Sequence, residues 1–154
     1  MTIFLETERI YLRQFTADDV DLVYDLNSDP DVMKYLSGGK PSTREEVIET
    51  IKKIMNLYTK YSNRFGVWAA HLKSNHEFIG FFILRPDKKD PDNEKVIELG
   101  YRLRKKFWRQ GFGSEISQPL VDRCFQLYGV EEVFATAHPD NHGSLQPDTR
   151  PVQN

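Results

Sequence analysis

The feature that most constrains this chain is the segment from residue 97 to residue 115. It predicts a strand, a basic turn, a Gly-x-Gly loop and a helix start in direct succession. Glycines let a loop turn tightly and let a ligand approach its amides closely. The first turn of a helix offers unbonded N–H groups and a partial positive charge. We therefore expect a phosphate-binding site there, with four cations close by in sequence: Arg104, Lys105, Lys106 and Arg109.

The glycine pair of this loop, Gly111 and Gly113, is a weak signal when it is considered alone. A helix start eased by glycine is then the more common explanation. A dinucleotide-binding fingerprint needs a third glycine where Ile116 stands. A nucleotide P-loop needs the Gly-Lys-Ser/Thr sequence, which does not occur here. Both of these nucleotide-binding folds are therefore excluded.

Hydrophobic periodicity along the rest of the chain predicts a mixed α/β or α+β domain. Strands are expected at residues 9–15, 65–72, 78–84, 96–103 and 133–137. Helices are expected at residues 20–26, in one or two turns within 31–36, after residue 42 and at 113–128. The last two strands are joined by a helical crossover, so they should run parallel, whereas the others are hairpin neighbours. The sheet should therefore be mostly antiparallel, with helices flanking it.

The longest expected helix begins at a capping box. Ser42 and Glu45 have the spacing with which a hydroxyl and a carboxylate cap the first turn. Its apolar stripe consists of Val47, Ile51, Ile54, Met55 and Tyr58. This spacing of three and four residues predicts one face packed on the sheet and one charged face in solvent.

The length of 154 residues predicts a single domain, and the composition is ordinary for a soluble globular protein. Lysine and arginine total 21 against 23 acidic residues, so no global field draws the chain to nucleic acid. No stretch is long or apolar enough for a signal peptide or a membrane span, which favours a cytoplasmic location. The one cysteine, Cys124, cannot form an intramolecular disulfide and is expected on a buried helix face. No cluster has metal-ligand spacing, so no metal is expected.

Three stretches carry a family resemblance. They are residues 5–13 (LETERIYLR), residues 98–115, which span the Gly-x-Gly loop, and residues 133–141 (VFATAHPDN). In this order and spacing the chain resembles the GNAT superfamily of N-acetyltransferases, and in particular its RimJ/RimL-like branch, which acetylates ribosomal proteins. The resemblance implies a twisted mixed sheet flanked by helices over residues 1–145, with residues 146–154 as an irregular polar tail.

The resemblance also implies roles for particular residues. The co-substrate would be acetyl-CoA, whose pantetheine arm would align with the backbone of the strand at Tyr101, Arg102 and Leu103. Its pyrophosphate would bind the loop amides, and Asn141 would contact the cofactor on the other side of the splay in the sheet. Glu98 matches a position from which many members direct general-base catalysis through water. The residues of the phosphate loop are Arg109, Gln110, Gly111, Phe112, Gly113 and Ser114.

The chain departs from this family in three places. Trp108 stands where glutamine or arginine often opens the phosphate motif, and Pro119 should bend or weaken the following helix. After residue 145 the family continues with a helix and two strands, whereas residues 146–154 form a polar, proline-containing segment. The fold is therefore expected to be C-terminally truncated, with the strand at 133–137 as an exposed edge. Such an edge predicts a homodimer or a swapped assembly.

The function that these features predict is transfer of acetyl from acetyl-CoA to a primary amine. The acceptor would be a protein N-terminus or a small molecule that attacks directly in a ternary complex. A carboxylate near water can take the amine proton, and backbone donors can stabilise the oxyanion. Two alternatives remain open at this point: a non-catalytic acyl-CoA-binding protein, and an inactive truncated GNAT domain that acts as an interaction module.

Overall fold

The computed structural model describes residues 2–34 and 40–135, together with the backbone of residues 152–153. The strands of this part are β1 (Ile3–Glu6), β2 (Ile10–Gln14), β3 (Gly66–Leu72), β4 (Phe78–Pro86), β5 (Val96–Leu103), β6 (Glu132–Ala135) and β7 (Val152–Gln153). The helices are α1 (Val20–Asn27), α2 (Pro30–Met33), α3 (Arg44–Lys60) and α4 (Phe112–Leu127), with 3-10 turns η1 (Ala17–Asp19) and η2 (Lys105–Phe107).

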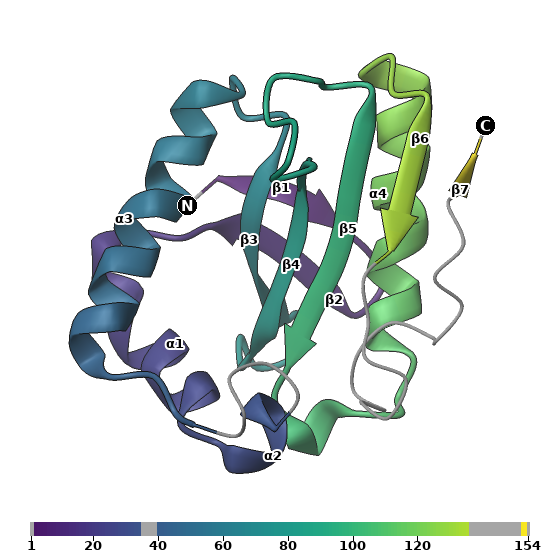
Figure 1. Cartoon of the computed structure of the whole chain (residues 1–154). Helices are drawn as coiled ribbons and strands as arrows, with labels where there is room; N and C mark the ends of the chain where they lie inside the picture. The colour runs from purple at the N-terminus through teal and green to yellow at the C-terminus, as the bar shows by residue number, and fades with distance from the viewer. Residues whose placement is uncertain (1, 35–39, 136–151, 154) are drawn as a thin grey trace.

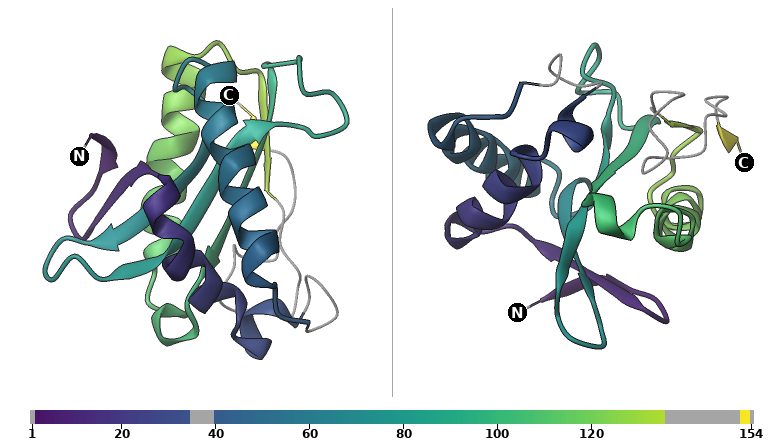
Figure 2. Two further views of the ribbon diagram at one scale, coloured as in Figure 1. Left: turned by 90° about the vertical axis from the view of Figure 1, so that its left-hand side faces the viewer. Right: turned by 90° about the horizontal axis from the view of Figure 1, so that it is seen from below.

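The described strands form one seven-stranded sheet, in which they lie side by side in sequence order. Helices α1 and α3 cover one face of this sheet and α4 covers the other (Figures 1 and 2). All neighbouring strands are antiparallel except β5 and β6, which run parallel and are joined through α4. This architecture confirms the predicted mixed, mostly antiparallel α+β fold.

The pairing of β5 with β6 covers only the first half of β5. It begins with Val96 opposite Glu132 and ends with Leu99 opposite Ala135. On its other side β5 pairs with β4 as far as Leu103, which lies opposite Gly80. The second half of β5 therefore extends past the described end of β6, and the start of α4 lies near this extension (Figure 1).

Helix α3 confirms the longest helix predicted from the sequence, with two differences in detail. The capping box is present, but it is formed by Thr43 and Glu46, one residue later than predicted. Val47, Ile51, Ile54 and Tyr58 are buried as expected, whereas Met55 is 39% exposed. At about 100° per residue, Met55 lies at the margin of the stripe that these four residues define, so it faces solvent.

Strand β1 was missed by the sequence analysis. It pairs antiparallel with β2 at Glu6 opposite Tyr11, and its Leu5 is the one of its residues that is buried. Four residues with a single inward side chain do not produce a readable alternation, so only the pairing with β2 identifies the strand.

The strand at the other end of the sheet corrects a second expectation. Val133 of β6 is fully buried and pairs with Val152 of β7, while Glu132 pairs with Gln153. The exposed edge expected over residues 133–137 is therefore wrong at Val133, and the homodimer predicted from that edge loses its basis there. Part of the tail expected to be irregular is likewise a strand.

Helix α4 contains the proline that the sequence predicts to bend or weaken it. It runs from Phe112 to Leu127 through Pro119 without a break. Cys124 is buried on this helix as predicted, and burial raises the pKa of its thiol to about 12. The cysteine is therefore a packing residue, because a protonated buried thiol is a poor nucleophile.

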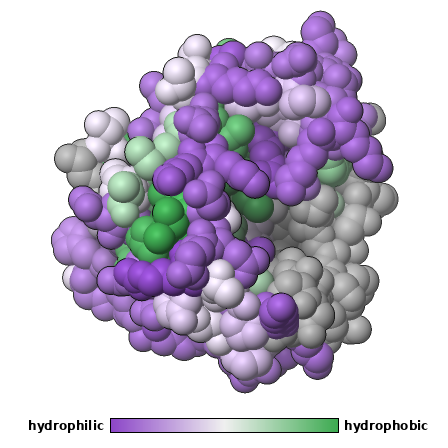
Figure 3. Space-filling view, turned by 60° about the vertical axis from the view of Figure 1, so that its left-hand side comes forward, coloured by the Kyte–Doolittle hydropathy of each residue, from purple (hydrophilic) through white to green (hydrophobic). Residues whose placement is uncertain are grey.

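The face of the molecule drawn in Figure 3 is mostly hydrophilic. Hydrophobic residues show there only over a limited area. The large apolar side chains that are exposed in the described part come from three elements: Ile3, Ile48, Met55 and Leu127. No described helix combines the length and apolar character needed to cross a membrane.

A buried polar network joins β2, β3 and η1. Arg13 donates through Nε to Nε2 of His71 at 3.1 Å and forms a two-pronged pair with Asp19 at 2.9 Å. Since His71 accepts at Nε2, it donates from Nδ1 to the carbonyl oxygen of His76 at 2.9 Å. The imidazole is therefore neutral in the folded protein. Burial lowers the pKa of His71, with a smaller opposing effect from the hydrogen bond to His76.

This network predicts that stability falls as pH decreases from 7.5 to 5.5. The unfolded chain binds a proton at His71 near its ordinary pKa of 6.5, whereas the folded chain resists it until a lower pH. The contribution is therefore complete above 6.5 and is lost as pH falls towards the folded pKa. Asp19 does not contribute in this window: although burial alone raises its pKa, the bonds from Arg13 and Thr16 lower it below 3.8.

Thermal melts across this pH range check the prediction. A His71→Gln variant should show a flatter dependence of melting temperature on pH than the unaltered chain. An unchanged slope in the variant would mean that another group causes the loss.

Candidate functional site

The second half of β5 presents its backbone in a defined direction. The Arg104 N–H donates to the carbonyl oxygen of Ile79 at 2.9 Å, so it points towards β4. Backbone direction alternates along a strand, so the N–H and C=O groups of Tyr101 and Leu103 point to the opposite side, where β6 lies. The carbonyl oxygen of Leu103 accepts a hydrogen bond there from the Trp108 indole at 2.9 Å.

The start of α4 is shaped for an anion. Gly111 precedes the helix with φ of 81°, a left-handed conformation that glycine adopts without strain, and Arg109 has φ of 62°. No side chain caps this helix start. The first bond of the helix runs from the Glu115 N–H to the Gly111 carbonyl oxygen at 3.0 Å. The amides of Phe112, Gly113 and Ser114 lie ahead of it and have no intrahelical acceptor.

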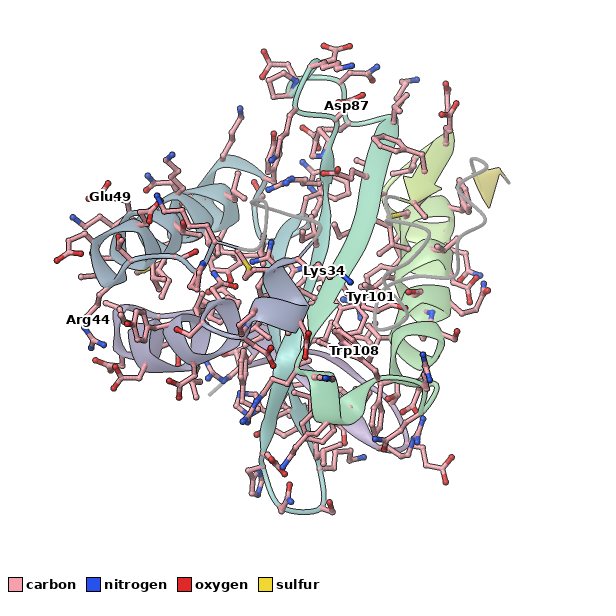
Figure 4. All side chains as sticks on the ribbon, turned by 60° about the horizontal axis from the view of Figure 1, so that its bottom comes forward. Lys34, Arg44, Glu49, Asp87, Tyr101 and Trp108 are labelled. Carbon is pink, nitrogen blue, oxygen red and sulfur yellow. The ribbon has the colours of Figure 1, made fainter. Side chains whose placement is uncertain are left out.

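Tyr101 and Gly113 bring the strand and the helix into contact. A Cβ atom added at Gly113 would lie 2.2 Å from Cζ and Oη of Tyr101, so no side chain fits there while the tyrosine keeps its place. Figure 4 shows Tyr101 and Trp108 where β5 turns towards α4, whereas Arg44, Glu49 and Asp87 lie on outer parts of the molecule. Burial raises the pKa of Tyr101, so its phenol is protonated at neutral pH.

A group of contacts from the β1–β2 turn fastens the helix start. Glu115 accepts hydrogen bonds from Thr7 Oγ1 at 2.5 Å, from Arg9 Nε at 2.5 Å and from the Arg9 N–H at 3.1 Å. Arg9 also donates to the Gln110 carbonyl oxygen at 3.2 Å and lies over the Phe112 ring. We call Thr7, Arg9 and Glu115 the latch, because they fix the phosphate loop to the sheet.

We expect a Glu115→Gln substitution to destabilise the chain by about 1 kcal/mol, after allowance for the partial exposure of the pair. The amide lacks the negative charge and cannot accept all three bonds. Urea denaturation measures the difference. Glu49→Gln is the matched control, since Glu49 pairs only with Lys52 on the exposed face of α3 at 3.4 Å and should change stability by less than about 0.5 kcal/mol. Equal effects of the two substitutions would show that the latch adds nothing.

The cations expected around the phosphate loop are mostly engaged elsewhere. Lys105 pairs with Asp31 of α2 at 2.5 Å. Lys106 and Arg104 both pair with Glu77, which lies between β3 and β4. Of the four predicted cations, Arg109 alone forms no ion pair within the described residues. Three of the four cations that the sequence places near the loop are therefore paired with acidic side chains distant in sequence.

The three paired cations line a cavity of about 530 Å³ on the other side of β5. Its described walls come from α1, α2 and the turn after β5: Asp25, Leu26, Asp29, Val32, Arg104, Lys105 and Lys106. The cavity lies beside the end of β5, on the sheet face that α1 covers. A molecule held there would approach β5 from the side opposite α4.

Glu98 and Arg102 lie on that same face of β5. Glu98 accepts a hydrogen bond from Arg85 Nε at 3.1 Å, directly across the strand pair, and the two side chains are 17% and 20% exposed. Glu98 is opposite Phe134, one residue before the described pairing with β6 ends. It is thus placed near the described end of this strand pairing, and its carboxylate is already held by a cation.

Arg102 has an unusual environment. Its Nη1 donates to Oδ1 of Asn27 at 2.6 Å, and its guanidinium lies over the Phe81 ring at 5.1 Å. Its Nε is buried with no hydrogen-bond partner among the described residues, and none of their carboxylates pairs with Arg102. Burial lowers the pKa of Arg102 to about 10, so it remains charged at neutral pH.

The structure thus brings most of the predicted site residues together and separates two of them. Tyr101, Leu103 and the loop from Arg109 to Ser114 meet at one place, while the side chains of Glu98 and Arg102 point to the other face. Asn141 lies outside the described residues.

Sequence reasoning missed Asn27 and the bonds of the latch, although Thr7, Arg9 and Glu115 stand in the stretches that carry the resemblance. Among the described residues no group of three or more His, Cys, Asp or Glu could hold a metal ion.

Comparison with known proteins adds independent evidence. A family model described as an acetyltransferase (GNAT) domain matches residues 9–146. The FsC-acetyl coenzyme A-N(2)-transacetylase of Aspergillus fumigatus is 31% identical over 134 residues, which are 84% of this chain and 56% of the fungal protein. The uncharacterized N-acetyltransferase YoaA of Bacillus subtilis is 29% identical over 141 residues, which are 91% of this chain and 76% of YoaA. The chain therefore spans little more than half of the fungal relative.

Solved structures agree on the fold. An acetyltransferase of the GNAT family from Bacillus anthracis has a TM-score of 0.74 at 24% identity, with 91% of this chain and 76% of that chain covered. A RimL ribosomal L7/L12 alpha-N-protein acetyltransferase in complex with coenzyme A has a TM-score of 0.73 at 17% identity, with 91% and 77% covered. At these identities the likeness supports the fold alone.

Proposed function

This chain belongs to the GNAT family of acetyltransferases, and we propose that it transfers acetyl from acetyl-CoA to a primary amine. The observation that carries the proposal is the uncapped start of α4, where Gly111 turns the chain and a row of amides has no intrahelical acceptor. A pyrophosphate satisfies such amides and the positive end of the helix dipole. The name of the fungal relative, which includes acetyl coenzyme A, is consistent with this donor.

The residues around the loop support this choice of donor. Gly111 leaves space above the helix start, since the atom nearest to an added Cβ there is Arg9 Nη2 at 3.6 Å. Arg109 supplies a cation on the same loop. Beside the loop, the backbone of Tyr101 and Leu103 points to the side where an extended arm with amide groups could align. We propose that these residues hold the pyrophosphate and the pantetheine arm.

The chemistry needs little more than position and a proton acceptor. The amine nitrogen bonds to the acetyl carbonyl carbon, the carbon–sulfur bond breaks, and the sulfur leaves as a thiolate that takes up a proton. We propose that Glu98 accepts the amine proton through water. One of its oxygens is held by Arg85 Nε, and a carboxylate has capacity for further hydrogen bonds. Residues on β5 orient the amine relative to the carbonyl carbon.

The test is calorimetric titration of the chain with acetyl-CoA, followed by thiol release with a panel of amines and short peptides. We expect saturable binding and turnover with at least one amine. A Glu98→Gln variant should lower kcat by about 100-fold or more while leaving acetyl-CoA affinity unchanged. Loss of affinity in the variant would assign Glu98 a structural role. Failure of the unaltered chain to bind acetyl-CoA would contradict the proposal.

A second candidate is acyl-CoA binding without turnover. The observation that favours it is the ion pair between Glu98 and Arg85, which occupies the carboxylate expected to act as base. Binding of acetyl-CoA with no thiol release across the whole amine panel would select this candidate over the transferase.

A further inference from the structure

Arg102 is a charged group that nothing in the described protein neutralises. Its neighbours are an amide oxygen, Oδ1 of Asn27, and the aromatic face of Phe81. The other arginines that contact the sheet face under α1 have carboxylate partners: Arg13 pairs with Asp19, and Arg85 pairs with Glu98. Burying a cation without a counter-ion is costly. A binding site is one reason for a protein to keep such a group.

The position of Arg102 separates it from the pyrophosphate loop. Successive side chains on a strand point to opposite faces. Tyr101 contacts Gly113 of α4, so Arg102 points to the α1 face, where its contact with Asn27 confirms the direction. The phosphates of a donor bound at the start of α4 therefore lie across the sheet from this guanidinium. The anion that Arg102 is suited to bind must belong to another molecule.

In the proposed reaction the donor binds at the start of α4, which leaves the α1 face for the approach of the acceptor. Leu26, next to Asn27, lines the 530 Å³ cavity, and so does Arg104, two residues after Arg102. The cavity is bounded by α1, α2 and the turn after β5, opposite to α4. Hence Arg102 stands beside the space from which an amine would reach the end of β5.

We propose that Arg102 binds a carboxylate of the acceptor, so that the preferred substrates are amines that carry a free carboxyl group. This inference rests on the proposed acetyl transfer and names its substrate class. A guanidinium offers a planar fork of N–H donors that matches the two oxygens of a carboxylate. Nε, the buried atom without a partner, is one prong of that fork. Asn27 holds Nη1 and thereby orients the group.

The first experiment uses a series of unbranched amino acids from glycine to 6-aminohexanoate, each with its carboxamide. The series varies the distance between amine and carboxyl group, which the structure does not specify. We expect at least one acid to be acetylated with kcat/KM about tenfold or more above that of its amide. The melting temperature in the presence of CoA should rise with the same acid and not with its amide, which gives a readout without turnover.

Three variants connect the preference to Arg102. Arg102→Met keeps the length of the side chain and removes the charge, and should bring the ratio of acid to amide close to one. Arg102→Lys keeps the charge and loses the fork, and should retain only part of the preference. Arg64→Met is the control, because Arg64 pairs with Glu94 at the surface and should leave the ratio unchanged.

A fourth variant tests directly, without any substrate, whether the charge of Arg102 is uncompensated. Asn27→Asp places a carboxylate 2.6 Å from Nη1 and gives Arg102 the counter-ion that the described residues do not supply. We expect the melting temperature to rise by about 3 °C or more and the preference for acids to disappear. An unchanged or lower melting temperature would show that the charge of Arg102 is not uncompensated, and would overturn the inference.

The outcomes separate this inference from the proposed function. If acetyl-CoA does not bind, the transferase proposal fails, while the melting temperature of the Asn27→Asp variant still decides the premise about Arg102. If acetyl-CoA binds and amines react with no preference for acids, or with one that survives Arg102→Met, this inference alone is wrong. A large loss of acetyl-CoA affinity in Arg102→Met would also overturn it, because the anion would then belong to the donor.

Discussion

We expect a Gly111→Trp substitution to lower acetyl-CoA affinity at least 100-fold, which corresponds to about 2.7 kcal/mol. The indole would occupy the space above the start of α4, where an added Cβ meets only Arg9 Nη2 at 3.6 Å. The amides of the first turn would then be shielded from the pyrophosphate. Calorimetric titration with acetyl-CoA measures the loss, and thermal melts show whether the variant is folded.

The control for this variant is a glycine just after the other end of the same helix. Gly129 follows α4 at its other end with φ of 68°, and nothing lies within 4 Å of an added Cβ. Gly129→Trp therefore carries a similar left-handed strain, about 1 to 2 kcal/mol, without touching the phosphate loop. It should bind acetyl-CoA as the unaltered chain does. Equal loss in both variants would point to general destabilisation, and full affinity in Gly111→Trp would place the donor elsewhere.

We expect a Gly80→Ala substitution to be the most destabilising small change in the chain, at about 2 to 5 kcal/mol. An added Cβ would lie 2.1 Å from the Arg102 carbonyl oxygen and 2.8 Å from Leu103 Cα, and the backbone there has φ of 145°. Both atoms belong to the main chain of β5, so neither can turn aside. The strands β4 and β5 must separate where β5 reaches the candidate site.

Urea denaturation measures this effect, with Gly129→Ala as the reference. That variant adds the same methyl group at a left-handed position with open space, so it should cost about 1 kcal/mol. Affinity for acetyl-CoA should also fall in Gly80→Ala, because the end of β5 shifts. A difference of less than about 1 kcal/mol between the two variants would show that β4 and β5 yield more easily than their contacts indicate.

The parts of the site that sequence predicted are those set by neighbours along the chain. The succession of strand, turn, Gly111, Gly113 and helix appears in the structure as β5, η2 and α4. Glycine conformation and helix termini depend on a few consecutive residues, so a short motif is enough to indicate them. The resemblance to the acetyltransferase family rested on such motifs, and the family comparison confirms it.

Sequence did not predict the electrostatic partners of the basic residues, and its prediction of an exposed edge was wrong at Val133. Arg104, Lys105 and Lys106 were expected near the phosphate loop because they are close to it in sequence. In the folded chain they pair with Glu77 and Asp31, tens of residues away. Charge pairing depends on distance in space, and a local pattern of basic residues does not show which acids the fold brings near.

By itself the sequence determined the family, the mixed sheet and the loop with its helix start, because backbone conformation and hydrophobic period are properties of short segments. Only the tertiary structure decided that Glu115 is fastened to Thr7 and Arg9, that Gly80 must lack a side chain, and that Arg102 lies half-buried against Asn27 with no counter-ion among the described residues. Each of these contacts joins elements distant along the chain. Their residues become neighbours only when the sheet has formed and its faces have been covered.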